Sequence, residues 1–479
     1  MTILQPSRVS VVQSLAVTTT SKPVDRVLLV GGGHAHVQVI KALNSKSRPK
    51  NMHVTLIDMQ KSASYSGMVP GCIARLYKPE DTLLHLLPLA EWAGIDFCQD
   101  EVVDMDLENN LVYLRNSDRP IPFDVVSVDI GSASRRLYET PGARKYTIPT
   151  RPISDLVQRI DQAEQTLEET AHVVVVGGGA AGVELSMSIM GRWGTILANG
   201  CLKVTLLDTG PRLLPNESPA CQHALSKIMK EKGIDARHNC EVQEITQQVI
   251  CLKDGEEISY THCIWATGAS AHPLANTLRK RGLAVDSYGW IRVNEHLQSL
   301  SHPQVFAAGD CSSIETGTGP PPPKAGVYAV RAGPILIENL VNFVSHEEMT
   351  DYVPQNDFLK LIVCGDGTAL GFHSGIPLYG KWVMQLKDAI DQTFMNLFRR
   401  ENLPDLDEGA SYDTTQYDAA LEKKQWSRLS PEETAELLQR TDDDVDYEQA
   451  WHALREMTKN DEYRALVVEC VEKQTKLAR

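Results

Sequence analysis

The sequence predicts an α/β protein with two parallel β-sheets, each covered by helices, followed by a small α/β segment and a helical tail. Three observations support this fold class. An apolar stretch that runs into glycines and then into a helix occurs twice, and each copy is followed by a second apolar stretch ending in Asp. No apolar run reaches the roughly 18 residues that a membrane-spanning helix needs. The two copies are RVLLVGGGHAHV with HVTLID at 53–58, and HVVVVGGGAAGVEL with KVTLLD at 203–208.

The composition is typical of a globular intracellular enzyme. The net charge of −15, without a basic stripe interleaved with aromatic residues, argues against nucleic acid as a partner. The 10 cysteines show neither C-x-x-C nor C-x4-C spacing, which indicates reduced thiols and no metal site. We therefore expect an intracellular protein, either cytoplasmic or in an organelle such as the mitochondrion or plastid.

The first glycine turn departs from the G-x-G-x-x-G pattern of dinucleotide-binding loops. Gly31 and Gly33 supply the tight turn and the close approach to a diphosphate, and His36 replaces only the third glycine, which serves helix packing. We therefore expect a working diphosphate cradle whose helix lies somewhat farther from the strand. Asp58, at the end of the next strand, is placed for ribose hydroxyls. His34 and His36 are interpreted as packing and polar lining of the nucleotide site, because no acid or cysteine cluster supports a metal.

The second glycine turn is complete, with Gly177, Gly179 and Gly182 at the expected spacing. Free N–H groups and the helix dipole at this turn attract phosphates. Asp208 ends the following strand, where its carboxylate accepts from ribose hydroxyls and repels a 2′-phosphate. This arrangement predicts NADH, and the nearby Arg212 leaves NADPH as an alternative.

Further apolar strands alternate with these units and end in glycine. FDVVSVDIG ends at Gly131, THCIWATG ends at Gly268, and VFAAGD carries Gly309 and Asp310 at its end. The proline run at 320–323 can form neither a helix nor a central strand, so we expect a fixed loop there, followed by a helix.

The last part of the chain changes character. Residues 382–398 have apolar positions at helical spacing, which favours packing on the first domain or on a second subunit of a homodimer. Peripheral membrane contact through 382–398 is the alternative. In residues 401–479 acidic residues outnumber basic ones two to one, and Ser430 with Glu433 forms a capping box. We expect a solvated acidic helical tail, with partner docking as the alternative.

The two turns, ATG at 266–268 and VFAAGD at 305–310 together resemble the FAD-dependent pyridine nucleotide-disulfide oxidoreductase superfamily, over roughly residues 25–400. The resemblance implies two Rossmann-like three-layer domains, one inserted in the other, with FAD on the first glycine turn and NAD(P)H on the second. The implied divisions are an FAD-binding domain at 25–150 and 280–345, an NAD(P)H-binding domain at 151–279 and an interface segment at 346–400. Composition adds a disordered leader at 1–24, with an organelle presequence as the alternative, and the acidic tail at 401–479.

The resemblance also implies roles for single residues. It places Asp310 at the ribityl hydroxyls of FAD and Lys324 as a cation at the edge of the flavin ring. Glu184 matches an acid that lies near the nicotinamide and orients it, the alternative being an acid that complements the helix dipole. We expect Glu184 and Lys324 to be the catalytic residues. The further cofactor-binding residues that the resemblance implies are Gly67, Pro70, Gly71, Gly131, Gly268, Ala325 and Gly326.

A redox disulfide is missing from the expected place after the first glycine turn. The segment YSGMVPGCIARLY carries Cys72 alone, and a single thiol cannot form an intramolecular disulfide. This resembles the single-flavin branches, namely type II NADH dehydrogenases, ferroptosis-suppressor-like quinone reductases and sulfide–quinone reductases. GGGHAHV, YSGMVPG, PPKAGVYAVR and KDAIDQTFMNLF are most similar to the flavoproteins associated with selenide, water dikinase.

The resulting hypothesis is an FAD-dependent NAD(P)H oxidoreductase. It passes a hydride from NADH to FAD and electrons on to a quinone-like acceptor without a redox disulfide. The alternatives are an NADH-responsive redox sensor of the apoptosis-factor type and a sulfide–quinone reductase.

Overall fold

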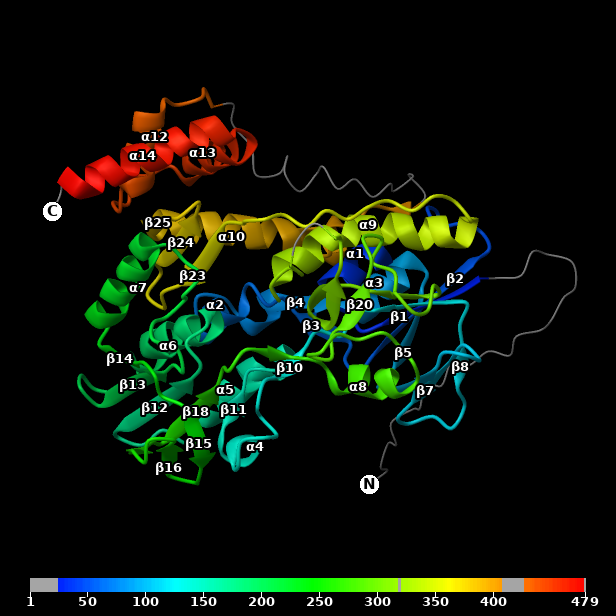
Figure 1. Ribbon diagram of the computed structural model, residues 1–479, viewed down its shortest axis with the longest axis horizontal. Helices are drawn as coiled ribbons and strands as arrows, with labels where there is room; N and C mark the ends of the chain where they lie inside the picture. The colour runs from blue at the N-terminus through cyan, green and yellow to red at the C-terminus, as the bar shows by residue number, and fades with distance from the viewer. Residues whose placement is uncertain (1–24, 318–319, 407–425, 478–479) are drawn as a thin grey trace, which may run out of the picture.

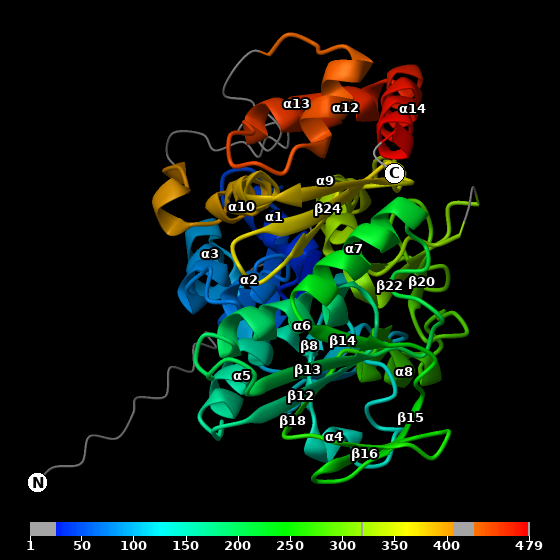
Figure 2. The same ribbon diagram turned by 90° about the vertical axis from the view of Figure 1, so that its left-hand side faces the viewer.

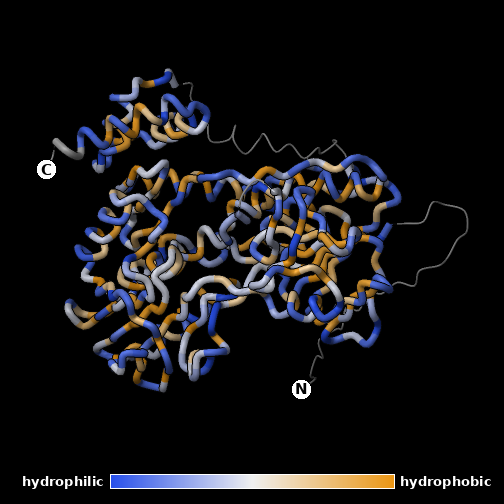
Figure 3. Tube along the Cα trace, in the orientation of Figure 1, coloured by the Kyte–Doolittle hydropathy of each residue, from blue (hydrophilic) through white to orange (hydrophobic). Residues whose placement is uncertain are grey.

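The computed structural model describes residues 25–317, 320–406 and 426–477 (Figure 1). The predicted leader at 1–24 and part of the predicted tail lie outside the described residues. Two lobes lie side by side, and the three C-terminal helices lie above the left-hand one (Figure 1). Hydrophobic residues concentrate in the strands and helices inside each lobe (Figure 3).

The first domain is built on a five-stranded parallel sheet in the order β21-β9-β1-β2-β5. Its strands bury apolar side chains on both faces, as a parallel sheet between two covering layers requires. Helices α1, α3 and α9 lie on one side of the core, and the β6-β7-β8 meander with α8 completes it. The bounds are β1 Asp25–Val30, α1 His34–Ala42, β2 Met52–Asp58, β3 Ser62–Ser64, α2 Val69–Ile73, β4 Leu83–His85, α3 Leu86–Ala93, β5 Asp96–Gln99, β6 Val102–Asp106, β7 Leu111–Leu114, β8 Ile121–Pro122, β9 Val125–Val128, α8 Pro273–Lys280, β20 Ile291–Val293, β21 Val305–Ala307, β22 Ser312–Ile314 and α9 Gly326–Ser345.

The second domain repeats this plan with a parallel sheet in the order β11-β18-β12-β13-β14. Helices α5, α6 and α7 and the β15-β16-β17 meander pack around it. The bounds are α4 Ala143–Tyr146, β11 Ile148–Pro149, α5 Leu156–Glu164, β12 Ala171–Val176, α6 Ala180–Trp193, β13 Leu202–Leu207, α7 Pro219–Glu231, β14 Ile234–Arg237, β15 Val242–Ile245, β16 Val249–Leu252, β17 Glu257–Ser259 and β18 His262–Trp265.

The chain crosses between the domains through two adjacent antiparallel strands, β10 (Ala133–Ser134) and β19 (Ala269–Ser270). The predicted fold class, with one nucleotide-binding domain inserted in the other, is thereby confirmed. Helix α8 falls inside the sequence range predicted for the second domain, yet its Leu274, Ala275 and Leu278 belong to the core of the first. The reason is that α8 packs against β6 immediately after the return crossing.

The C-terminal segment joins both domains. It forms an antiparallel sheet of β23 (Lys360–Val363), β24 (Ala369–His373) and β25 (Ile376–Gly380), followed by α10 (Lys381–Asn396). Ile362 and Phe372 belong to the core of the second domain, whereas Phe394 and Phe398 belong to that of the first. A Cβ on Gly191 of α6 would lie 1.9 Å from the carbonyl oxygen of Gly365, so the two backbones touch.

The described tail consists of α12 (Pro431–Gln439), α13 (Tyr447–Lys459) and α14 (Asp461–Leu477). The predicted capping box of Ser430 and Glu433 starts α12 as expected. The helices lie across the C-terminal segment, with Ala435, Leu438 and Leu454 in one apolar cluster with Trp382 (Figure 2). The tail is therefore packed against the body of the protein rather than solvated on all sides.

Helix α10 buries the apolar face on which the membrane-contact alternative depended. Val383, Leu386 and Phe394 are at most 1% exposed, because the C-terminal sheet, the tail and the first domain cover them. The other interpretation, packing within the chain, is the one the structure favours for 382–398. Among the described helices, none combines the length and apolar character needed to cross a bilayer.

Candidate nucleotide and electron-transfer site

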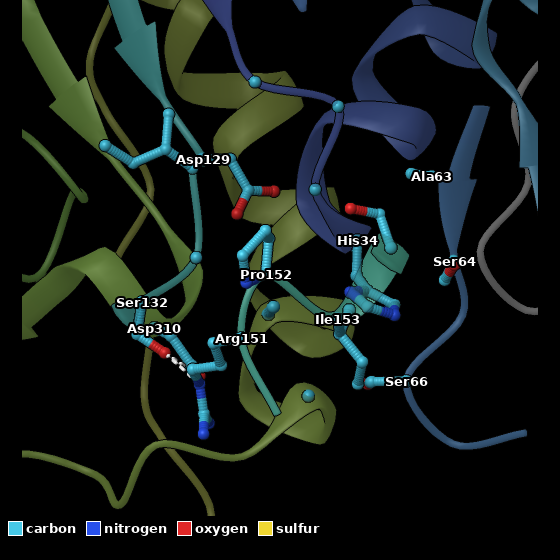
Figure 4. Close-up of a pocket in the computed structure, with 18 of the residues that line it drawn as sticks. His34, Ala63, Ser64, Ser66, Asp129, Ser132, Arg151, Pro152, Ile153 and Asp310 are labelled. Atoms are coloured by element: carbon cyan, nitrogen blue, oxygen red, sulfur yellow. Dashed lines mark hydrogen bonds and ion pairs between the residues drawn. The ribbon is translucent and has the colours of Figure 1, made fainter. Parts of the chain in front are cut away.

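A cavity of about 540 Å³ lies between the two domains, at the carboxyl ends of the strands of the first sheet (Figure 4). Open parallel sheets bind their ligands at this edge, where the connecting loops converge. The first glycine turn, the loop after β9, residues 151–154, the start of α9 and the start of α6 all contribute to the wall.

The first glycine turn is shaped by the backbone and side chain of Asp129. Gly31 has a φ of +87°, and a Cβ there would lie 2.4 Å from the carbonyl oxygen of Asp129. A Cβ on Gly33 would lie 2.3 Å from Asp129 Oδ1, so both positions require glycine. His36 is fully buried, its Nδ1 lies 2.6 Å from the carbonyl oxygen of Gly31, and its Nε2 lies 2.8 Å from Ser127 Oγ. This imidazole joins the turn to β9 on the side away from the cavity, which it does not line.

Asp58 lines the cavity and braces the same turn. Its Oδ2 accepts from the N–H of Gly32 at 2.7 Å, and its Oδ1 accepts from the N–H of Gln60 at 2.8 Å. Burial raises the pKa of this carboxyl, and the two N–H groups oppose that shift. The predicted ribose contact stays a prediction.

Asp129 is a pocket residue that sequence reasoning did not single out. Its Oδ2 accepts from the N–H groups of Ala35 at 2.9 Å and His36 at 3.2 Å, in the first turn of α1. Burial, with contributions from Asp310 and Asp58, raises the pKa of this carboxyl to about 7. The local sequence contained one hint of this role, because Asp129 stands two residues before Gly131, where the strand was predicted to end.

One end of the cavity combines two predicted residues, Asp310 and Lys324, with Ser132 and Arg151, which were not predicted. Ser132 Oγ donates to Asp310 Oδ2 at 3.1 Å, and Arg151 donates to Ser132 Oγ at 2.7 Å and lies 3.5 Å from Asp310. Lys324 donates to the carbonyl of Ser312, and its Nζ lies 4.4 Å from the centre of the Trp290 ring. Burial lowers the pKa of Lys324.

The His34 imidazole lines the cavity beside aromatic side chains. Its ring centre lies 5.2 Å from that of Tyr65 and 6.1 Å from that of Phe394, which comes from α10. Burial lowers the pKa of His34 to about 4, so the ring is neutral at physiological pH. Its Nε2 is buried and has no hydrogen-bond partner among the described residues.

The second glycine turn has the geometry that the sequence predicted. A Cβ on Gly182 would lie 1.8 Å from the carbonyl oxygen of Gly177, which reflects close packing of α6 on β12. A Cβ on Gly178 would meet the Asp208 side chain at 2.3 Å, whereas nothing lies within 4 Å of one on Gly179. The next two residues of α6, at 180–181, line the cavity, so the open side of this turn borders it.

Glu184 bonds α6 to β23 and lies within electrostatic range of a buried ion pair in α10. Its Oε1 accepts from the N–H of Val363 at 2.8 Å. Burial raises the pKa of Glu184 to about 7, although Lys387 and the Val363 N–H act in the opposite direction. Lys387 donates to Asp391 Oδ2 at 2.7 Å and to the carbonyl of Gly67 at 2.6 Å. Burial opposes the charge of Lys387, but Asp391 and Glu184 outweigh it and keep its pKa raised.

The structure brings most, but not all, of the predicted site residues to this cavity. Those that line it are Gly31, Gly33, His34, Asp58, Pro70, Gly131, Glu184, Asp310, Lys324, Ala325 and Gly326. Those that do not line it are His36, Gly67, Gly71, Gly177, Gly179, Gly182, Asp208, Gly268 and Gly309. Gly71 instead faces the Tyr77 ring, 2.5 Å from where its Cβ would be, and the Gly67 carbonyl accepts from Lys387.

Comparison with known proteins matches this arrangement. Residues 25–333 match the family described as pyridine nucleotide-disulphide oxidoreductase. The type II NADH:quinone oxidoreductase of Haemophilus influenzae is 24% identical over 386 residues, covering 72% of this chain and 86% of that protein.

Two solved structures have the same fold. The sulfide:quinone oxidoreductase of Aquifex aeolicus superimposes with a TM-score of 0.67 at 17% identity, covering 80% of this chain and 94% of the other. The NDH2 of Plasmodium falciparum, solved in complex with NADH, gives a TM-score of 0.66 at 14% identity, covering 83% and 97%.

Proposed function

Because the chain belongs to the pyridine nucleotide-disulphide oxidoreductase family, we propose that it is an FAD-dependent NADH:quinone oxidoreductase that works without a redox disulfide. One observation carries the proposal. The first glycine turn and the start of α6, which follows the second glycine turn, line a single cavity, and the thiol that follows the first turn is buried. The names of the relatives, which include NADH:quinone and sulfide:quinone oxidoreductases, support a quinone as acceptor.

The residues of the first turn fit an FAD. In the first turn of α1 the N–H groups of Ala35 and His36 already donate to Asp129 Oδ2, so a diphosphate would be held at the Gly33–His34 end of the turn. Nothing lies within 4 Å of a Cβ on Gly131, so the cavity is clear there. Asp58 and Asp310 both line the cavity, and their carboxylates would accept from the ribose and ribityl hydroxyls of FAD. The buried, unpartnered Nε2 of His34 is a further polar atom that a bound group would satisfy.

Bound FAD supplies the two-electron chemistry that connects NADH to a quinone. The chain's own residues bind and orient the reactants. The second glycine turn holds the diphosphate of NADH, and Asp208 beneath Gly178 favours NADH over NADPH. Glu184, one turn into α6, faces the cavity from the same domain and orients the nicotinamide.

Quinone reduction also consumes protons, and the buried acid–base cluster of α6 and α10 is placed to deliver them. The Glu184 carboxyl has a pKa of about 7, the range in which a general acid is most effective at neutral pH. Lys387, paired with Asp391, lowers the pKa of Glu184 and so stabilises the carboxylate that remains once the proton has left. We therefore assign Glu184 a second role as proton donor to the acceptor.

The thiols argue for NADH rather than sulfide as the electron donor. Burial raises the pKa of Cys72 to about 11 and those of Cys311 and Cys364 to about 12. Only a thiolate is an effective nucleophile, so these buried thiols are poorly suited to bind persulfide intermediates.

The test is an anaerobic titration of the purified protein. We expect a yellow protein whose flavin absorbance bleaches with NADH, does not bleach with sulfide, and returns when a soluble quinone is added. A colourless protein that gains no absorbance with added FAD contradicts the proposal. Bleaching without reoxidation by any quinone would favour the redox-sensor alternative, and bleaching by sulfide alone would favour sulfide oxidation.

A further inference from the structure

We propose that Asp129 binds the FAD diphosphate as a neutral carboxylic acid, so that FAD binding takes up one proton from solution. The inference rests on the proposed function, because it concerns the FAD site. It deepens that proposal by assigning a positioning role to a residue that the glycine-turn pattern does not contain.

The geometry places the two oxygens of Asp129 in different environments. Oδ2 is fixed by the N–H groups of Ala35 and His36 in the first turn of α1. Oδ1 has no hydrogen-bond partner in the part of the chain that the structure describes, and the side chain lines the cavity next to the glycine turn (Figure 4). A Cβ on Gly33 would lie 2.3 Å from Oδ1, and one on Gly309 would lie 2.7 Å from it. Two glycines from separate segments therefore leave room for this one oxygen.

The electrostatics of this corner disfavour a carboxylate next to a diphosphate. The N-terminus of α1 favours a nearby negative charge, but an ionised Asp129 and a diphosphate would both lie there and repel each other. The acids that face Asp129 are Asp58 and Asp310, and both raise its pKa. The neighbouring cations are engaged elsewhere, Arg151 with Asp310 and Lys324 with the carbonyl of Ser312.

The other titratable neighbours do not supply a positive charge. The buried imidazoles of His34 and His36 are neutral, because burial lowers the pKa of each to about 4. The thiol of Cys311 is neutral as well, since burial raises its pKa to about 12. Of these groups, the Asp129 carboxyl, with a pKa of about 7, is the one that loses its charge at least cost at neutral pH. Protonated at Oδ1, it donates to a phosphate oxygen while Oδ2 continues to accept from α1.

The sign of the pH dependence follows from this protonation. Below pH 7 the carboxyl is already neutral and FAD binding takes up no proton. Above pH 7 the free protein holds a carboxylate, so each FAD bound takes up one proton, and the Kd rises about tenfold per pH unit. Asp129→Asn keeps an acceptor for α1 and places a permanent N–H donor toward the phosphate. We expect its Kd to be independent of pH and close to the low-pH value of the wild type.

The experiment is calorimetric titration of FAD into the full chain stripped of cofactor, at pH 6 and pH 8, in two buffers that differ in ionisation enthalpy. The difference between buffers counts the protons taken up. We expect about one proton at pH 8 and almost none at pH 6 for the wild type, and none at either pH for Asp129→Asn. Asp96→Asn, at an exposed carboxyl of β5 outside the cavity, serves as the matched control and is expected to keep the uptake at pH 8. Asp58→Asn and His34→Gln test the two neighbouring titratable groups.

The outcomes separate this inference from the proposed function. Absence of proton uptake in the wild type at pH 8 would overturn the Asp129 assignment without any variant having to fold. Uptake that persists in Asp129→Asn and disappears in His34→Gln or Asp58→Asn would move the proton to that residue and also overturn it. If FAD fails to bind at either pH in every protein, the proposed function itself fails.

Discussion

At the scale of single residues, His36 explains how the first glycine turn keeps its shape without a third glycine. In the second turn Gly182 lets the α6 backbone approach the carbonyl of Gly177. In the first turn the His36 imidazole takes that place and contacts the carbonyl of Gly31 and the hydroxyl of Ser127. The sequence predicted that the cradle survives, because the two phosphate-facing glycines are intact. It could not predict the bond to Ser127, since that residue lies on a strand 91 positions away.

Two glycine substitutions distinguish the structural from the ligand-facing positions. Gly179→Ala places a methyl group in open space, so we expect normal folding and FAD content but an increase in the KM for NADH of at least about tenfold, because the diphosphate loses its close approach. Gly33→Ala collides with Asp129 and is expected to abolish FAD binding. Steady-state kinetics and FAD content measure both effects. An unchanged KM in Gly179→Ala would contradict NADH binding at the second turn.

The Glu184 carboxyl gives the reaction a predicted pH profile. Its pKa of about 7 means that the acid is protonated below that pH and ionised above it, so quinone reduction at saturating NADH should decline as the pH rises through 7. Glu184→Gln should keep its FAD, lose this pH dependence and turn over on the order of 100-fold more slowly. Stopped-flow measurement of flavin reduction by NADH and of flavin reoxidation by quinone separates the two roles assigned to Glu184. If Glu184→Gln slows only the reoxidation step, Glu184 does not orient the nicotinamide.

At the scale of elements, α10 shows what periodicity can and cannot predict. The spacing of Val383, Leu386 and Phe394 predicted a helix with one apolar face, and the structure has that helix at Lys381–Asn396. The charged residues Lys387 and Asp391 lie between these apolar positions, yet they are buried as well. Both are at most 5% exposed, because the segment near Gly67 covers them, and nothing in the local sequence reports that tertiary contact.

The buried pair of Lys387 and Asp391 makes a stability prediction. Lys387→Met leaves a buried carboxylate without its partner, and such a loss destabilises a protein by about 3–5 kcal/mol. The double variant Lys387→Met, Asp391→Leu removes both charges and should recover most of that loss. Denaturant unfolding monitored by circular dichroism compares the three proteins. A double variant as unstable as the single one would show that the ion pair itself is not responsible.

At the scale of the whole molecule, the internal repeat predicted two nucleotide-binding domains, but their boundaries shifted where the chain crosses between them. Helix α8 follows the β10–β19 crossing and packs on the first domain, although its sequence carries no mark of which core it joins. The same holds for the C-terminal segment. Hydrophobic periodicity identifies a buried face, whereas the partner of that face is decided by long-range topology.

Removal of the tail tests its packing against the body. A chain that ends at residue 406 would expose the apolar cluster around Leu378 and Trp382, so we expect a lower thermal midpoint and self-association at micromolar concentration. FAD content should be retained, because no residue of the described tail lines the cavity. Light scattering and thermal unfolding of the shortened chain measure these effects. A monodisperse product with an unchanged midpoint would show that the tail is dispensable for stability.

The contact between Gly191 and Gly365 has a consequence for how reactants come and go. This contact packs the C-terminal sheet against α6 of the second domain, whereas Phe394 of α10 belongs to the core of the first domain. The C-terminal segment therefore fixes the two domains to each other on one side. A movement of the two domains away from each other would expose apolar residues of both hydrophobic cores to water. We therefore expect the nicotinamide nucleotide to bind and leave without a large change in the distance between the two domains, and turnover to need no domain opening.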